Sequence, residues 1–356
     1  MPQNAAQRAD GVFEGGGVKG IAFAGAIQAA EEGAGVEEWV NVAGTSAGSI
    51  VAALLVVGFS AQEIREVLAE TEYRRFADYG AAGKIVGGAV NAFRLRGFAP
   101  GRYFRDWLGE RFEQKLGKRD PTFADVVRND LPDDLTPEQR EQARFRLRVI
   151  ASDVTAGRML VLPDDIEGYE NESGWRMTKD ELPLVDAVRM SMSYPFLFNP
   201  VRLYQGGKPH HIVDGGLLSN FPIWLFDSPH PKRPTWGFRL HSGEGPEELP
   251  FRKIPRPLWQ LPLAKAMFHS TMEAWDRQHM SKVTAVRTVS IPTHEIKTTQ
   301  FGLTKDDAES LYRWGYEEAK TFFESADQQE YLNSFGHTLG AAASKEEPAL
   351  TGAPTK

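Results

Sequence analysis

The apolar positions at the start of the chain form two short runs, and each run leads through a glycine-rich turn into a longer apolar stretch. The short runs are 12–13 and 39–43, and the longer stretches are 21–30 and 50–57. A short apolar run that leads through a turn into a longer run of helical length is typical of a strand followed by a helix. Two such units in succession predict a parallel sheet with helices on its faces, and therefore an α/β fold.

Later parts of the chain continue this alternation of strand-like and helix-like stretches. Ser60-Ala61-Gln62-Glu63 is a capping box that predicts a helix start. We expect strands at 145–152, 159–162, 235–240 and 285–291, a hairpin over 199–213, and helices at 183–192, 261–280 and 305–323. No internal repeat interrupts the pattern.

The second glycine-rich turn reads Gly44-Thr45-Ser46-Ala47-Gly48, a G-x-S-x-G sequence between the expected strand and helix. A serine at such a turn is held with its hydroxyl exposed at the helix N-terminus. The amide groups and the macrodipole there favour negative charge on an attacking oxygen. Gly44 and Gly48 allow the strained turn and the close approach of neighbouring backbone. Ser46 is therefore a candidate nucleophile.

The first glycine-rich turn consists of Gly15, Gly16, Gly17, Val18, Lys19 and Gly20. Three successive glycines expose backbone N–H groups, which together make a pocket for an anion. In an acyl-transfer enzyme that anion is the tetrahedral oxyanion, and each well-aimed donor contributes about 3 kcal/mol. The two turns thus offer a nucleophile and an oxyanion hole within one short stretch of chain.

The first turn also fits G-x-G-x-x-G, the fingerprint of dinucleotide-binding folds. That fingerprint expects an acidic residue about 20 positions further on, at the end of the second strand. Here the second strand runs directly into Gly44-Thr45-Ser46, with no acid at its end. A nucleotide-binding module that holds a pyrophosphate on this turn remains the alternative function.

Two regions depart from the alternation of strands and helices. Residues 71–143 combine a glycine- and alanine-rich stretch, an amphipathic stretch at 103–116 and a strongly charged stretch at 130–144. We interpret them as a helical insertion that covers the site. Residues 335–356 are rich in alanine, glycine, proline and glutamate without any period, which predicts a disordered tail.

Composition excludes several classes of function. The net charge of −7 and the pI near 5.7 argue against a nucleic-acid partner and against tight binding to anionic membranes through bulk charge. The absence of cysteine excludes disulfides, thiolate metal sites and a cysteine nucleophile, and it fits a reducing cytoplasm. The polar N-terminus lacks the apolar core of a signal peptide, and no apolar run approaches the ~20 residues of a membrane span. We expect a cytoplasmic protein that contacts membranes at most peripherally.

A serine hydroxyl needs a base, which is most often histidine. None of the eight histidines stands in a glycine-flanked turn after a strand, and strand alternation would turn only one of His210 and His211 towards the site. Asp214 ends an apolar strand and is followed by two glycines, in the same strand-to-turn position as Ser46. A carboxylate is a weak base, so this pair needs close geometry and a pKa raised by burial. The other interpretation is that Asp-Gly-Gly is simply a turn.

The order of the three motifs resembles that of the patatin-like phospholipase family, with a glycine-rich turn, an early G-T-S-A-G and a later D-G-G. The resemblance implies a three-layer α/β/α sandwich with a mostly parallel central sheet. The residues it assigns are the nucleophile Ser46, the proton acceptor Asp214 and the oxyanion donors Gly16, Gly17 and Val18. The glycines that match the motifs are Gly15, Gly20, Gly44, Gly48, Gly215 and Gly216.

The resemblance covers roughly residues 8–325 and implies hydrolysis of acyl esters through an acyl-serine intermediate, without metal or cofactor. Members commonly carry Arg where Lys19 stands here. The segment 191–196 is similar to the family's segment that lines the acyl pocket. We therefore expect a phospholipase A or lipid esterase whose partner is a lipid or ester substrate, and a lipid-binding scaffold with little turnover is a further alternative. An ordinary α/β-hydrolase fits worse, because its nucleophile usually follows several strands.

Overall fold

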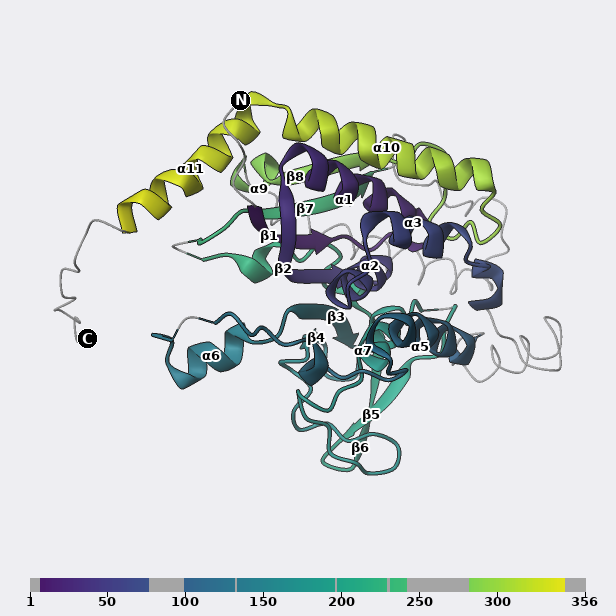
Figure 1. The fold of residues 1–356 in the computed structure, drawn as a ribbon. Helices are drawn as coiled ribbons and strands as arrows, with labels where there is room; N and C mark the ends of the chain where they lie inside the picture. The colour runs from purple at the N-terminus through teal and green to yellow at the C-terminus, as the bar shows by residue number, and fades with distance from the viewer. Residues whose placement is uncertain are drawn as a thin grey trace.

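The computed structural model describes residues 7–76, 99–131, 133–195, 197–228, 231–241 and 282–342. These residues contain one mixed sheet. Its strands are β1 (Gln7–Phe13), β2 (Val36–Thr45), β3 (Leu147–Asp153), β4 (Arg158–Leu162), β5 (Val201–Gln205), β6 (Lys208–Asp214), β7 (Thr235–His241) and β8 (Thr288–Pro292). The strand order is β5-β6-β3-β2-β1-β7-β8, and β4 pairs with β3 (Figure 1).

The centre of the sheet is parallel. Strands β3, β2, β1, β7 and β8 all run in one direction. Strands β4 and β6 run antiparallel to β3, and β5 runs antiparallel to β6. The predicted α/β class with a mostly parallel sheet is confirmed.

The helices connect and cover these strands. They are α1 (Ile21–Gly33), α2 (Ala47–Val56), α3 (Ala61–Ala69), α5 (Arg102–Leu116), α6 (Pro137–Ala143), α7 (Leu184–Ser191), α9 (Lys282–Val286), α10 (Lys305–Phe323) and α11 (Ala326–Ala342). Short 3-10 helices are η1 (Gly17–Gly20), η2 (Tyr73–Phe76), η3 (Phe123–Val126), η4 (Gly215–Leu217) and η5 (Ile223–Phe226). Within the described residues, none of these helices has the length and apolarity needed to cross a membrane.

Alternation along β1 separates the two faces of the sheet. Phe13 belongs to the large core under the helices, where its ring stacks on Phe238 at 5.2 Å. The preceding Val12 points to the other face and packs with Phe221 and Ile223 of the segment at η5. The sheet is therefore buried on both sides at its centre, as continuous apolar runs in parallel strands require.

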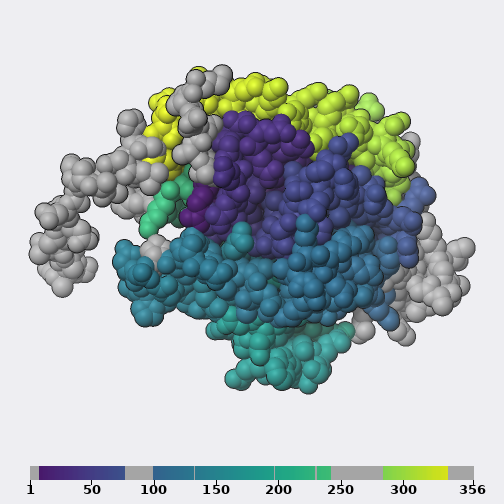
Figure 2. Space-filling view, viewed as in Figure 1, coloured from purple at the N-terminus to yellow at the C-terminus, as the bar shows by residue number. Residues whose placement is uncertain are grey.

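Helix α10 packs along α1, so the beginning and the end of the domain are adjacent. A Cβ atom on Gly25 of α1 would overlap the Tyr312 carbonyl, and one on Gly315 of α10 would overlap the Ala22 carbonyl. The two helices thus meet backbone to backbone. Figure 1 shows α10 lying beside α1, and in Figure 2 the yellow α10 region borders the purple N-terminal residues.

Most predicted elements lie where the sequence pattern placed them, including the hairpin and the Ser60 capping box before α3. The expected strand at 285–291 is partly wrong, because α9 continues to Val286 and β8 begins at Thr288. The expected helix at 261–280 lies outside the described residues.

Two predicted regions have mixed outcomes. The expected insertion contains α5 and α6, but 77–98 lie outside the described residues, so its cover over the site remains a prediction. Helix α11 extends beyond 335, into the segment expected to be disordered. Alanine has the highest helix propensity, which favours continuation of the helix despite the lack of an apolar period. Residues 343–356 lie outside the described part of the chain.

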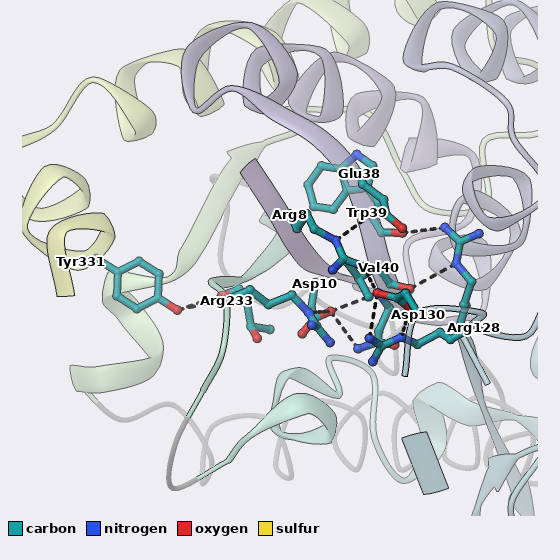
Figure 3. A network of polar contacts seen from close by, with 12 residues as sticks. Arg8, Asp10, Glu38, Trp39, Val40, Arg128, Asp130, Arg233 and Tyr331 are labelled. Carbon is teal, nitrogen blue, oxygen red and sulfur yellow. Dashed lines mark hydrogen bonds and ion pairs between the residues drawn. The ribbon is translucent and has the colours of Figure 1, made fainter. Parts of the chain in front are cut away.

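A network of charged side chains closes the amino ends of the parallel strands (Figure 3). Arg8 of β1 pairs with Glu38 and Asp130. The buried Asp10 carboxylate accepts hydrogen bonds from Arg233 at 2.8 Å and from the Asn41 side chain at 2.9 Å. Burial raises the pKa of Asp10, and these two partners offset part of the rise. This network is structural in character and lies at the strand ends opposite to the two glycine-rich turns.

Candidate active site

Ser46 occupies a strained turn between β2 and α2. Its backbone has φ 52° and ψ −125°, and only His294 is another non-glycine residue with positive φ in the described chain. A Cβ on Gly44 would overlap the Gly48 carbonyl, and a Cβ on Gly48 would overlap the Phe13 carbonyl. The two glycines therefore allow the turn to close against β1, and the turn holds Ser46 in a conformation that costs free energy.

The register of the sheet brings Asp214 to the same place. Thr45 of β2 pairs with Ile150 of β3, and the next residue of β3, Ala151, pairs with Asp214 of β6. Ser46 and Asp214 thus flank one point of β3 from its two sides. Strand β6 is antiparallel to β3, whereas β2 is parallel to it, so the strands that end at Asp214 and at Ser46 run in opposite directions. The sequence pattern had suggested equivalent strand-to-turn positions for the two residues.

The Asp214 carboxyl group is fully buried. Its Oδ1 accepts a hydrogen bond from the Gly216 amide at 2.8 Å. Burial raises the pKa of Asp214 to about 7, although the Ser46 hydroxyl and the Gly216 amide both act to lower it. Oδ2 has no hydrogen-bond partner of good geometry in the described part of the chain. The Ser46 hydroxyl therefore lies beside a carboxyl oxygen with an open acceptor position.

The hydroxyl itself points elsewhere in this conformation. Ser46 Oγ lies 3.6 Å from Met192 Sδ, which is a weak acceptor. Ser46 is only 9% exposed, so Met192 covers the oxygen from the apolar side. A hydroxyl group rotates readily, and a turn from sulfur to carboxylate exchanges a weak hydrogen bond for a strong one.

The turn at the end of α7 holds both residues. Ser191 Oγ accepts a hydrogen bond from the Ser46 amide at 2.8 Å, and the Ser193 carbonyl accepts one from the Asp214 amide at 3.0 Å. The buried Arg189 in turn donates to Ser193 Oγ at 2.6 Å. It also donates to the carbonyls of Pro100 and Asn199, each at 3.0 Å. Sequence reasoning missed these roles of Ser191, Ser193 and Arg189, because only the folded arrangement defines them.

The first glycine-rich turn lies against the serine turn. The Gly15 amide donates to the Asn220 carbonyl at 3.1 Å, and a Cβ on Gly15 would lie 3.2 Å from the Ser46 Cβ. The Val18 amide, which was expected in the oxyanion hole, donates to the Thr298 carbonyl at 3.2 Å. The amides of Gly16 and Gly17 donate to none of the described residues, and Gly17 begins η1, where an amide has no partner within the helix.

Among the described residues, no histidine side chain contacts Ser46 or Asp214. His210 shares one face of β6 with Asp214, but it lies four residues earlier, about 13 Å along the strand. Its Nδ1 is 2.6 Å from Asp153 Oδ2, which also accepts a hydrogen bond from the Tyr169 hydroxyl. His211 faces Thr155 at 3.3 Å. The side chains of His230, His269, His279 and His337 lie outside the described residues.

No group of three or more potential ligands among the described residues could hold a metal ion. The candidate ligands for such a group are histidine, aspartate and glutamate, since the chain has no cysteine.

Comparison with known proteins identifies the family of this chain. The family model described as patatin-like phospholipase matches residues 11–227, which include both glycine-rich turns and Asp214. The uncharacterized protein YqhO of Bacillus subtilis (strain 168) is 34% identical over 88% of this chain and 97% of its own length. The uncharacterized protein R571 of Acanthamoeba polyphaga mimivirus is 22% identical over 86% of this chain and 91% of its own.

Among solved structures, VipD from Legionella pneumophila has a similar fold. The TM-score is 0.54 at 17% identity, over 90% of this chain and 67% of that one. At this identity the likeness concerns the fold alone. The family model spans more than half of the chain, and the chain therefore belongs to the patatin-like phospholipase family.

Proposed function

We propose that this chain is a serine acyl hydrolase that cleaves the ester bonds of lipids, as a phospholipase A or a lipid esterase. Membership of the patatin-like phospholipase family supports a lipid ester hydrolase in general. The finer assignment is carried by one observation, which is the strained Ser46 beside a buried carboxyl group whose pKa is about 7. A base with this pKa is half ionised near neutral pH, where general base catalysis is most effective.

In the proposed mechanism, the Asp214 carboxylate removes the proton from Ser46 Oγ as the oxygen attacks the ester carbonyl carbon. The carbonyl π electrons move to oxygen, and the amides of Gly16 and Gly17 donate hydrogen bonds to the oxyanion. Protonated Asp214 then gives its proton to the leaving alcohol as the C–O bond breaks, which leaves an acyl group on Ser46.

Water completes the cycle by hydrolysing the acyl-serine, with water as the nucleophile and Ser46 as the leaving group. Asp214 takes a proton from a water molecule, whose oxygen attacks the acyl-serine carbonyl carbon. When the tetrahedral intermediate collapses, Ser46 recovers its proton from Asp214 and the fatty acid is released. One ester and one water become one alcohol and one carboxylic acid, and no metal or cofactor takes part in the proposed steps.

The geometry of the glycine-rich turn favours this function over nucleotide binding. The Gly15 and Val18 amides are occupied by the carbonyls of Asn220 and Thr298. The two remaining amides suffice for one oxyanion, whereas a pyrophosphate needs a larger set of donors.

The first prediction concerns the nucleophile. Replacement Ser46→Ala removes the attacking oxygen, so hydrolysis of p-nitrophenyl butyrate and of mixed phospholipid vesicles should fall by roughly 10⁴-fold or more. Labelling by a fluorophosphonate probe should disappear as well. Ser60→Ala is the matched control, because it removes a hydroxyl from the surface cap of α3 and should keep activity and labelling. Persistent labelling of the Ser46→Ala protein would refute Ser46 as the nucleophile. If the unmodified protein binds lipid without hydrolysing it, the chain is instead a lipid-binding scaffold.

The second prediction concerns the pH dependence set by Asp214. Ionisation of the base should make kcat/KM rise through an apparent pKa near 7 and reach a plateau above it. Asp214→Asn should abolish this rise together with most of the activity. An active Asp214→Asn protein with an unchanged pH profile would exclude the carboxyl group as the base.

The same raised pKa predicts a change in stability, because the folded state binds the Asp214 proton more tightly than the unfolded chain does. This contribution is complete below pH 3.8, the ordinary value, and is lost as the pH rises to about 7. Above pH 7 the buried carboxylate therefore destabilises the fold. Asp214→Asn should raise the melting temperature at pH 8 relative to the unmodified protein, and by more than it does at pH 5. A lower melting temperature at pH 8 would contradict the proposed burial cost.

The fourth prediction concerns Arg189, a positioning residue that acts through Ser193 on Asp214. Arg189→Met removes the hydrogen bonds of the guanidinium group, so kcat should fall at least tenfold with little change in KM. The rise of kcat/KM with pH, which follows ionisation of Asp214, should also move away from pH 7. Arg189→Lys should restore part of kcat, because an ammonium group still donates to nearby oxygens. A Met variant with lower stability but unchanged kcat and pH profile would reduce Arg189 to a structural role.

A further inference from the structure

A cavity lies beside α7, and neither Ser46 nor Asp214 is among the residues that line it. It has a volume of about 720 Å³ and is bounded by α5, β5, α7 and the segment 171–183. This size falls within the ~300–1,000 Å³ of typical small-molecule sites. Figure 1 shows α5, α7 and β5 grouped below the central strands. Neither Ser46 nor Asp214 lines this space, although the positioning residue Arg189 does.

Helix α7 contributes residues both to the cavity wall and to the contacts of Ser46. Asp186, Arg189 and Met190 line the cavity, and their i, i+3, i+4 spacing places them on one side of the helix. Ser191 and Met192, which contact Ser46, follow directly after these residues at the end of α7. Neither of them lines the cavity, and Ser46 and Asp214 do not line it either, although α7 borders both places.

One part of the cavity wall is apolar. Trp175 is 60% exposed, the highest value among the exposed large apolar residues of the described chain. It borders the cavity together with Met177, Leu182, Met190 and Leu203. An exposed tryptophan at the edge of an apolar cavity marks a surface that a ligand can cover. An alkyl chain fits a wall of this chemistry.

The polar part of the wall contains an arginine that takes part in a weak ion pair. Arg202 of β5 faces Glu172 at 3.7 Å, and the Glu172 side chain is 69% exposed, so this ion pair is weak. Asn199 also lines the cavity, and its buried Oδ1 has no hydrogen-bond partner among the described residues. That oxygen is enclosed by protein atoms, so it does not face the open part of the cavity.

The acidic residues of the cavity wall leave Arg202 available to an anionic ligand. The Asp186 carboxylate is held by Arg105 at 2.9 Å, and Glu181 accepts a hydrogen bond from Thr178 at 2.8 Å. Among the acidic residues that line the cavity, Glu172 is the one paired with Arg202, and its exposure lets it turn into solvent. The wall as a whole contains four arginines, Arg102, Arg105, Arg189 and Arg202, against the three carboxylates Glu172, Glu181 and Asp186. Its charge therefore favours an anion.

We propose that this cavity is a second ligand site, distinct from the Ser46 site, for a single-chain amphiphile that carries a carboxylate. The alkyl chain lies along Trp175 and Met177, and the carboxylate accepts hydrogen bonds from Arg202. The site goes beyond the proposed hydrolysis, because Ser46 and Asp214 do not line it; Arg189 is shared, since it lines the cavity and also positions Ser193.

Isothermal titration of the full chain with sodium decanoate, below its micelle concentration, tests the proposal. Fluorophosphonate-treated protein should bind one decanoate as well as untreated protein does. Arg202→Gln and Trp175→Ala should each weaken binding about tenfold, through loss of a charged hydrogen bond and of apolar contact. Arg176→Gln, a neighbouring exposed arginine that does not line the cavity, is the matched control and should bind normally.

The ligand chemistry has its own comparison. 1-Decanol, which has the same chain without the charge, should bind at least tenfold more weakly than decanoate. Equal binding of decanol, tighter binding of decyl phosphate, or no effect of Arg202→Gln and Trp175→Ala would overturn the proposal. If fluorophosphonate fails to react at all, the hydrolase proposal fails, but the Arg202 and Trp175 variants still report on this cavity.

Discussion

The candidate site depends on one carboxyl group kept out of water at the end of β6. Burial of Asp214 raises its pKa to about 7, so the group that costs stability when ionised is the group that can act as a base near neutral pH. One oxygen is held by the Gly216 amide, and the other is left with an open acceptor position beside Ser46. The surrounding structure has to exclude water from this carboxyl group and fix its position.

Three parts of the fold meet these needs. The sheet places Ser46 and Asp214 on the two sides of β3 at adjacent register positions. The last turn of α7 then ties their backbones through Ser191 and Ser193, and Arg189 anchors that turn. A small displacement of α7 would therefore move both candidate catalytic residues together. This coupling also gives the cavity beside α7 a physical route to the site, because Arg189 contributes to both.

The sequence predicted the parts of the site that are encoded locally. Glycines around Ser46 mark a turn that only small residues permit, and the short apolar runs 12–13 and 39–43 indicate the parallel strands that lead to the two turns. The direction of β6 was not predictable in this way, since an apolar strand reads the same in either orientation. The roles of Ser191, Ser193 and Arg189 depend on hydrogen bonds between distant segments, which no local pattern records. The hydrogen bond from the Val18 amide to the Thr298 carbonyl was unpredictable for the same reason, because it also joins distant segments.

The central claim is spatial, and a crystal structure of the full chain after reaction with a methyl alkyl fluorophosphonate tests it most directly. The account predicts a phosphonate on Ser46 Oγ, with its phosphoryl oxygen within hydrogen-bond distance of the Gly16 and Gly17 amides and with Asp214 adjacent to the adduct. A phosphonate on another residue, or a phosphoryl oxygen directed away from both amides, would contradict it.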